Sequence, residues 1–153
     1  MKSAGKYFPG FLLALLLLAA WPGAGHSGAE EVSEYGNPFT WVTVGQVAVK
    51  AEVVQTPEKL YLGLGQRREL PAGRGMLFVM PRREVQHFCM RGMEFPLDFL
   101  WLAPGKVVGV EKNVPADYAG ALTSPGPVSF VLEVPGGFCD QYGIQAGDPA
   151  RWQ

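Results

Sequence analysis

The sequence predicts a β-rich barrel or sandwich with one or two short helices, and three observations lead to this prediction. The chain has 153 residues, 48% apolar and 18% charged, which suits one folded domain and excludes a disordered chain or a large multidomain enzyme. Short apolar runs alternate with turn residues along most of the chain. The 20 glycines and 13 prolines can supply the turns that many short strands need.

The first 29 residues have the features of a secretory signal peptide. Lys2 and Lys6 form a short basic region, and an apolar stretch runs from Phe8 to Trp21. This stretch is shorter than the ~20 apolar residues that span a bilayer, so we favour a cleaved signal over a permanent anchor. Small residues predict cleavage after Ala29, with Gly25 as the alternative site. The mature protein is therefore expected in the periplasm or outside the cell of a prokaryote, touching the membrane only through the transient signal.

We predict a flexible N-terminal lead over residues 30–40 and the folded domain over residues 41–153. The lead mixes acids with Ser33, Gly36 and Pro38 and has no apolar periodicity. After it, alternating valines over residues 47–54 predict a strand with one wetter face.

A short helix is predicted directly after that strand. Thr56 can cap the free amides of the first turn, and Pro57 suits the first helical position, which needs no donor. Gly63 and Gly65 keep the helix short, and Gly65 is expected to end it in a left-handed conformation.

Beyond Gly75 the pattern predicts further short strands. They are expected at residues 76–80, 85–90, 97–102, 107–110 and 128–134. Pro104 and Gly105 occupy the central positions of a type II turn, which predicts a hairpin between the third and fourth of these strands. Residues 115–127 predict a long polar loop. One helical turn is expected over Phe138 to Tyr142, stopped by Gly143.

Several spaced blocks of the sequence resemble the domain-of-unknown-function family 192. The blocks are Gly75-Met76-Leu77-Phe78, Phe88-Cys89-Met90, Pro96-Leu97-Asp98 and Leu132-Glu133, within a resemblance that covers Val47 to Asp148. It implies a mainly β (α+β), compact barrel-like single domain in a family of small, often exported proteins without an established activity. This chain has FCMRGM at residues 88–93, where Phe-Trp-Met-Lys-Asn-Thr is usual in the family.

Five residues are predicted to form a polar ligand site. Asp98 interrupts an apolar run, and a buried carboxylate needs backbone donors, an arginine partner or protonation. Glu133 poses the same question, and Arg67 is the best bidentate partner for either carboxylate. Phe88 and Trp101 are expected to pack beside them. The alternative is that each acid only ties a neighbouring loop through hydrogen bonds.

The functional prediction is a small binding or accessory module of the cell envelope, whose partner is an unknown small ligand or an envelope glycan. An enzyme is the less favoured class of function. The enzyme that the sequence suggests is an envelope glycan hydrolase with Asp98 and Glu133 as acid and base. The formal net charge of -1 and the lack of a nucleic-acid motif predict no nucleic-acid partner. Six arginines between residues 67 and 91 predict either internal ion pairs or an anion site. We expect a monomer.

Cys89 and Cys139 have two alternative interpretations. They form a disulfide in an oxidising compartment, or they are separate buried thiols. His87, Cys89 and nearby methionines suit Cu(I), so a soft-metal carrier is a third and weaker functional hypothesis. Methionines fill cores far more often than they bind metal, and the prediction is therefore no cofactor and no metal site.

Overall fold

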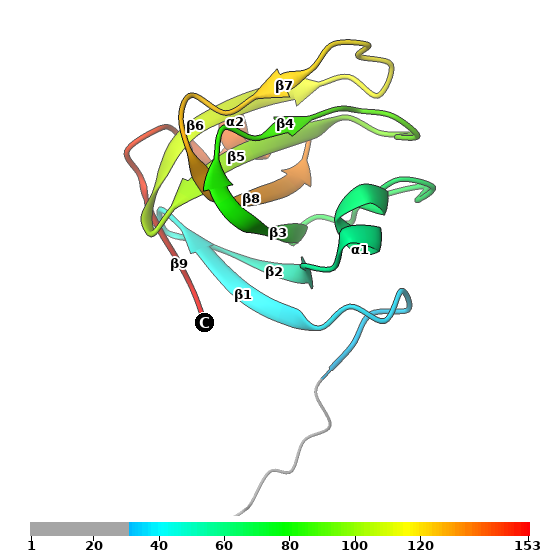
Figure 1. The fold of residues 1–153 in the computed structure, drawn as a ribbon. Coiled ribbons are helices and arrows are strands. Elements are labelled where there is room, and N and C mark those ends of the chain that lie inside the picture. Colours follow the sequence, from blue (N-terminus) through cyan, green and yellow to red (C-terminus); the bar gives the residue numbers. More distant parts are fainter. Residues whose placement is uncertain (1–30) are drawn as a thin grey trace, which may run out of the picture.

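The computed structural model describes residues 31–153, so the predicted signal peptide lies outside the described residues (Figure 1). The elements in chain order are β1 (Phe39–Val44), β2 (Val47–Val54), α1 (Pro57–Leu62), β3 (Arg74–Glu84), β4 (His87–Phe88), β5 (Leu97–Ala103), β6 (Gly105–Val114), β7 (Leu122–Thr123), β8 (Val128–Pro135), α2 (Phe138–Tyr142) and β9 (Pro149–Trp152). In this range no helix is both long and apolar enough to cross a membrane.

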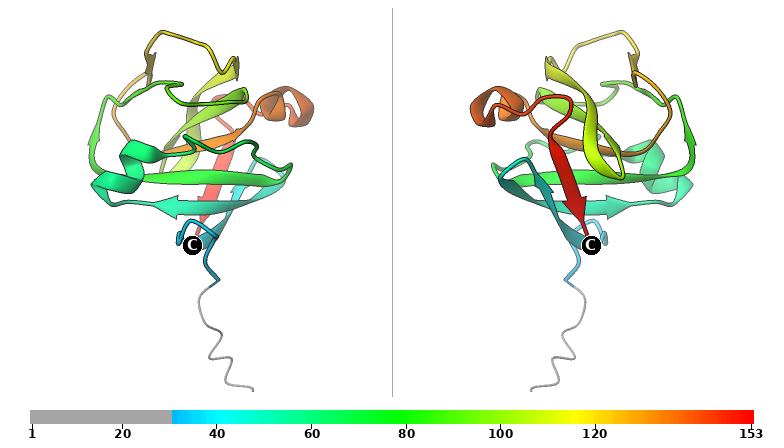
Figure 2. Two further views of the ribbon diagram at one scale, coloured as in Figure 1. Left: turned by 90° about the vertical axis from the view of Figure 1, so that its right-hand side faces the viewer. Right: turned by 90° about the vertical axis from the view of Figure 1, so that its left-hand side faces the viewer.

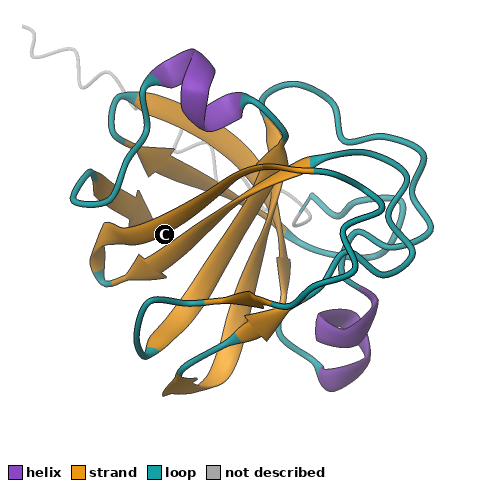
Figure 3. Cartoon of the chain, turned by 90° about the horizontal axis from the view of Figure 1, so that it is seen from above, coloured by secondary structure: helices purple, strands orange, loops and turns teal. Residues whose placement is uncertain are grey.

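Seven strands close into a barrel, which confirms the predicted mainly β fold and decides against a sandwich. Their order is β1-β2-β3-β8-β5-β6-β9, and β9 pairs with β1 to complete the ring. All pairs are antiparallel except β2 with β3, which run parallel because α1 and its loops carry the chain back between them. Figure 3 shows the barrel wall from above, with both helices outside it.

The barrel wall is apolar on part of both faces. One core cluster takes residues from all seven barrel strands and is therefore the barrel interior, with Leu77, Leu100 and Leu132 among its members. A second cluster lies on the outer face and includes Met76, Phe99 and Trp101. The two-stranded sheet of β4 and β7, beside β5 and β6 in Figure 1, belongs to the layer over this second cluster. Every residue of β5 from 97 to 102 is consequently buried.

Local sequence signals were accurate at α1 and at the β5–β6 hairpin. The Thr56 hydroxyl accepts a hydrogen bond from the Lys59 amide at 3.4 Å, as predicted for a capped helix. The helix ends two residues earlier than expected, because Gly63, with φ of 52°, forms the cap and Gly65 does not. Gly105 has φ of 86°, which fits its place in the predicted turn.

Three strands escaped the sequence analysis. β1 begins at Phe39, so residues 39 and 40 belong to the barrel, and residues 31–38 make a turn with a bridge between Val32 and Pro38. β7 lies inside the predicted polar loop, and β9 occupies the last residues of the chain. Each is short or pairs with a distant strand, so local periodicity does not reveal it. The predicted turn at residues 138–142 is confirmed as α2, which lies on the opposite side of the barrel from α1 (Figure 2).

Candidate functional site

Asp98 is a fully buried structural anchor. It lies on β5 with no exposed surface, and its carboxylate accepts hydrogen bonds from three backbone amides. The donors are Asn113 at 2.7 Å, Gly137 at 3.1 Å and Cys139 at 2.7 Å. These bonds fasten β6 and the start of α2 to β5. A buried carboxylate needs backbone donors, an arginine partner or protonation, and Asp98 uses backbone donors. The predicted pairing of Asp98 with Arg67 does not occur.

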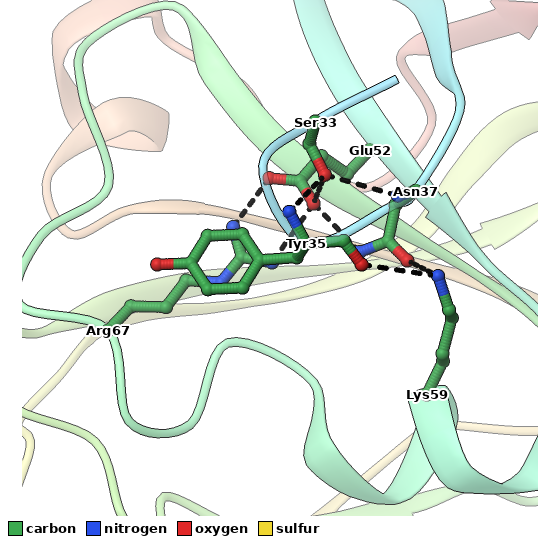
Figure 4. Close-up of polar contacts among 6 residues, drawn as sticks. All are labelled: Ser33, Tyr35, Asn37, Glu52, Lys59 and Arg67. Atoms are coloured by element: carbon green, nitrogen blue, oxygen red, sulfur yellow. Dashed lines mark hydrogen bonds and ion pairs between the residues drawn. The ribbon is translucent and has the colours of Figure 1, made fainter.

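Arg67 instead pairs with Glu52 on β2, which the sequence analysis did not single out. The guanidinium Nη2 lies 2.9 Å from Glu52 Oε2, and both side chains are about nine-tenths buried. The Tyr35 ring covers the guanidinium at 3.8 Å (Figure 4). Glu52 holds Arg67 because both of its carboxylate oxygens lie within bidentate reach of the guanidinium.

The turn before β1 completes this cluster. Ser33 Oγ and Asn37 Nδ2 each donate a hydrogen bond to Glu52 Oε2 at 2.8 Å, and Lys59 Nζ bonds Asn37 Oδ1 (Figure 4). Burial by itself would raise the pKa of Glu52, but the hydrogen bonds and the charge of Arg67 outweigh it and lower that pKa. Residues predicted as a flexible lead thus hold a buried ion pair, a role without any local sequence pattern.

A cavity of about 510 Å³ lies beside this ion pair. It is lined by three arginines and three glutamates: Arg67, Arg68, Arg74, Glu34, Glu52 and Glu69. The two signs of charge are balanced around it, and Arg67 is already neutralised by Glu52. Arg67 thus forms an internal ion pair, but its partner is Glu52 and neither of the two predicted carboxylates.

Glu133 lies on β8 and faces away from Asp98. In the pairing of β5 with β8, Phe99 lies opposite Glu133 and Asp98 lies opposite Val134. Successive side chains of a strand point to opposite faces, so the two carboxyl groups are on opposite faces of the barrel wall. They cannot flank one glycosidic bond, which removes the geometric basis of the predicted hydrolase.

The Glu133 carboxyl is buried and unpaired among the described residues. The side chain is only 5% exposed, and burial raises its pKa to about 8, against the opposing charge of Arg67. No hydrogen bond from residues 31–153 contributes to this shift. At neutral pH the group is therefore mostly protonated and can donate one hydrogen bond.

Glu133 opens onto a cavity of about 210 Å³. The barrel wall forms its inner side, through Phe78 and Met80 of β3 together with Glu133. Its outer walls are the end of α1 with the turn after it, at residues 60–65, and the segment around β4, at residues 87–93. Most of the lining residues have apolar side chains, but about half of the cavity surface is polar. Glu133 is the one acidic residue that contributes to it.

The two predicted aromatic residues stand at this cavity in different ways. Phe88 lines it and makes edge-to-face contacts with Phe78 at 5.0 Å and with Trp101 at 5.7 Å. Trp101 has no exposed surface and supports Phe88 from behind. The structure therefore brings Phe88, Trp101 and Glu133 together, whereas Arg67 and Asp98 lie outside the cavity.

The cavity rim contains two residues outside the five that were predicted to form the ligand site. Tyr61 of α1 is 76% exposed, and the Arg91 guanidinium lies 4.8 Å from the centre of its ring. Both residues line the cavity. The signal for Arg91 was present in the sequence, because it belongs to the central block in which this chain departs from its family.

The predicted disulfide is absent: Cys89 and Cys139 are both free. Cys89 is exposed at the cavity rim, whereas Cys139 is buried in α2 at the end of the barrel interior. Burial, followed by the nearby charge of Asp98, raises the pKa of Cys139 to about 12. The two thiols belong to separate clusters, so pairing would require taking Cys139 out of the core.

The residues of the Cu(I) hypothesis are divided between cavity and core. His87, Cys89, Met80 and Met93 line the cavity, but Met76 and Met90 are buried in the outer-face cluster. His87 Nδ1 lies 3.1 Å from Thr123 Oγ1, a contact between β4 and β7. No group of three or more His, Cys, Asp or Glu residues that could hold a metal ion occurs within residues 31–153.

Comparison with known proteins gives a family and a fold. Residues 40–152 match the domain-of-unknown-function family 192 (DUF192), described as an uncharacterised ACR. A protein of unknown function from Novosphingobium aromaticivorans has 29% identity and a TM-score of 0.76, over 82% of this chain and 94% of its own. A proposed transcription regulator from Sinorhizobium meliloti has 25% identity and a TM-score of 0.72, over 80% and 97%. No curated protein matches. The chain belongs to the domain-of-unknown-function family 192.

Proposed function

We propose that this protein is an exported binding module that holds a small, mostly apolar molecule in the cavity over Glu133. The observation that carries the proposal is the Glu133 carboxyl, which is 5% exposed, has no hydrogen-bond partner among the described residues and opens into that cavity. A ligand with an acceptor atom at this position would accept a hydrogen bond from the protonated carboxyl.

The energetics of burial support this role. A polar group held in an apolar setting without a partner costs several kcal/mol in model transfers, and about 1–3 kcal/mol in protein substitutions. Glu133 takes no part in fastening the fold through its side chain, unlike Asp98 with its three backbone donors. Small-molecule sites commonly combine apolar and aromatic walls with a few polar groups, one of which has a perturbed pKa.

The N-terminal sequence supports an envelope location. The basic start, the apolar stretch and the small residues before Glu30 have the order of a cleaved signal. An accessory role in the periplasm, in which the module carries or senses a small molecule, agrees with a small single domain.

Phenol is a suitable first probe, because it combines one apolar ring with one hydrogen-bonding group. We expect phenol to shift the amide NMR signals of residues 60–65, 87–93 and 133 in the mature protein. The variant Cys89→Trp, which adds bulk at the rim, should weaken phenol binding. Its matched control is Val85→Trp, because Val85 is 42% exposed and does not line the cavity.

Two results would contradict this function. Shifts scattered over the surface, or confined to other residues, would mean that the cavity is not the site. Equal weakening by Cys89→Trp and Val85→Trp would attribute the loss to the added tryptophan and not to the filled rim.

A further inference from the structure

We infer that the ligand is a single-ring aromatic acid, whose ring occupies the cavity, whose ring hydroxyl or carbonyl meets Glu133, and whose carboxylate meets Arg91. This inference rests on the proposed function and names the class of ligand for the same site. Size, wall chemistry and the two ends of the cavity each restrict the ligand independently.

The cavity is open on one side, and its enclosed part suits a ligand of about one ring. The cavity has about 210 Å³, and a dry cavity of about 150 Å³ accommodates benzene. The remaining space suits one or two small substituents. A glycan chain or a long acyl chain would not be enclosed.

The walls favour a flat aromatic ring over an aliphatic chain. Phe78 and Phe88 meet edge to face with centroids 5.0 Å apart, so both present ring faces and edges to the same region. Met80 and Met93 also line the cavity, and thioether sulfur makes favourable contacts with aromatic rings. Leu64 completes the apolar surface.

The inner end requires a hydrogen-bonding oxygen. Glu133 is the acidic residue on the side of the cavity that the barrel wall forms, and at neutral pH its carboxyl is mostly uncharged. A carboxylate placed against it would lose its hydration deep in the cavity, whereas an uncharged phenolic hydroxyl or carbonyl oxygen can accept its hydrogen bond at a lower cost of desolvation.

The rim supplies a cation for the other end of the ligand. Arg91 lies over the Tyr61 ring, and none of the ion pairs within residues 31–153 involves it. The amide of Gln66 donates to the carbonyl of Gly92 at 3.1 Å, which fixes the Arg91 segment to the turn after α1. A guanidinium held in this way suits bidentate binding of a carboxylate.

The test compares 4-hydroxybenzoate, benzoate and phenol as probes, titrated by NMR at pH 6.5. We expect 4-hydroxybenzoate to bind most tightly. Arg91→Gln should weaken binding of both carboxylates by about tenfold, because a hydrogen bond to a charged group is lost, and should leave phenol binding unchanged. Arg82→Gln is the matched control, because Arg82 is exposed on β3 and does not line the cavity.

The Glu133 end has its own readout. In the unmodified protein, affinity for 4-hydroxybenzoate should fall as the pH rises through about 8, because an ionised carboxylate can no longer donate. Glu133→Gln keeps an amide donor of the same shape and should abolish this pH dependence. An unchanged pH profile in that variant would overturn the assignment of the inner end.

The outcomes separate the ligand class from the proposed function. If phenol binds in the cavity but the carboxylates gain nothing, or if Arg91→Gln affects all three probes equally, the aromatic-acid inference is wrong and the binding function stands. If none of the three probes binds, the proposed function fails as well.

Discussion

Two glutamates on one face of the barrel show how partners decide the state of a carboxyl group. Glu52 on β2 and Glu133 on β8 both lie opposite Met76 of β3 in the strand pairings, so all three form one row. Glu52 receives donors from three side chains, and its pKa is lowered. Glu133 receives none from residues 31–153, and its pKa is raised to about 8. Both side chains have little exposed surface, but Glu133 is more strongly desolvated, so deeper burial and the lack of donors together separate the two pKa values.

The raised pKa of Glu133 predicts a pH-dependent stability. Between its ordinary pKa of 4.5 and about 8, the folded state binds more protons at this group than the unfolded state, so stability falls as the pH rises through this window. Each pKa unit corresponds to about 1.4 kcal/mol, which makes the total loss several kcal/mol. Chemical denaturation at pH 5, 7 and 9 measures it.

Glu133→Gln is the control for this titration. The variant cannot ionise, so its stability should lack the decline between about pH 5 and pH 8. Parallel curves for the two proteins would mean that Glu133 is not the titrating group. NMR titration of the Glu133 carboxyl carbon gives its pKa directly.

Asp98 acts at the scale of elements, because its carboxylate joins β5, β6 and α2. Asp98→Ala leaves three backbone amides without their acceptor and should lower the free energy of unfolding by about 3 kcal/mol or more. Asp98→Asn keeps one oxygen for Asn113 and Gly137 and loses the acceptor for Cys139, so a smaller loss is expected. Denaturant unfolding measures both.

Asp117→Ala is the matched control for the Asp98 variants, because Asp117 is exposed, and its removal should change stability by less than about 0.5 kcal/mol. If the Asp98→Ala protein still folds, it should also bind phenol, because Asp98 lies outside the cavity. A stable Asp98→Ala protein with lost phenol binding would restore Asp98 as a ligand residue.

At the element scale, the sequence was reliable where a local rule applies. The Thr56 cap and the Pro104-Gly105 turn depend on neighbouring residues, and both were predicted correctly. The prediction of one solvent-exposed face on β2 is correct only at the start of the strand, where Ala48 is exposed. Further along the same face, Glu52 and Val54 are buried. Strand periodicity indicates two faces but not what will cover them.

Barrel closure is a property of the whole molecule that depends on its last residues. β9 pairs with both β1 and β6, so it joins the start of the domain to its middle. The same closure buries α2 residue Cys139 at one end of the interior, while Cys89 stays exposed on the other layer. We therefore expect the two thiols to differ in reactivity.

We therefore expect the exported protein to begin at Glu30 and to carry two free thiols. Iodoacetamide should modify Cys89 in the folded protein, and Cys139 only after denaturation, because a buried thiol with a pKa of about 12 forms no thiolate at neutral pH. Intact-mass spectrometry before and after alkylation reads both results. A mass lower by two hydrogens would instead reveal a disulfide, and a retained leader would contradict cleavage after Ala29.

The sequence by itself determined the mainly β fold, the family, the capped helix and the β5–β6 hairpin, because each follows from composition, spaced motifs or contacts between near neighbours. Only the tertiary structure decided which charges meet. In the folded chain Arg67 pairs with Glu52, Asp98 accepts hydrogen bonds from three backbone amides, and Glu133 faces a cavity. These outcomes depend on strand order and on which segment covers the outer face, and both are long-range properties that no local pattern encodes.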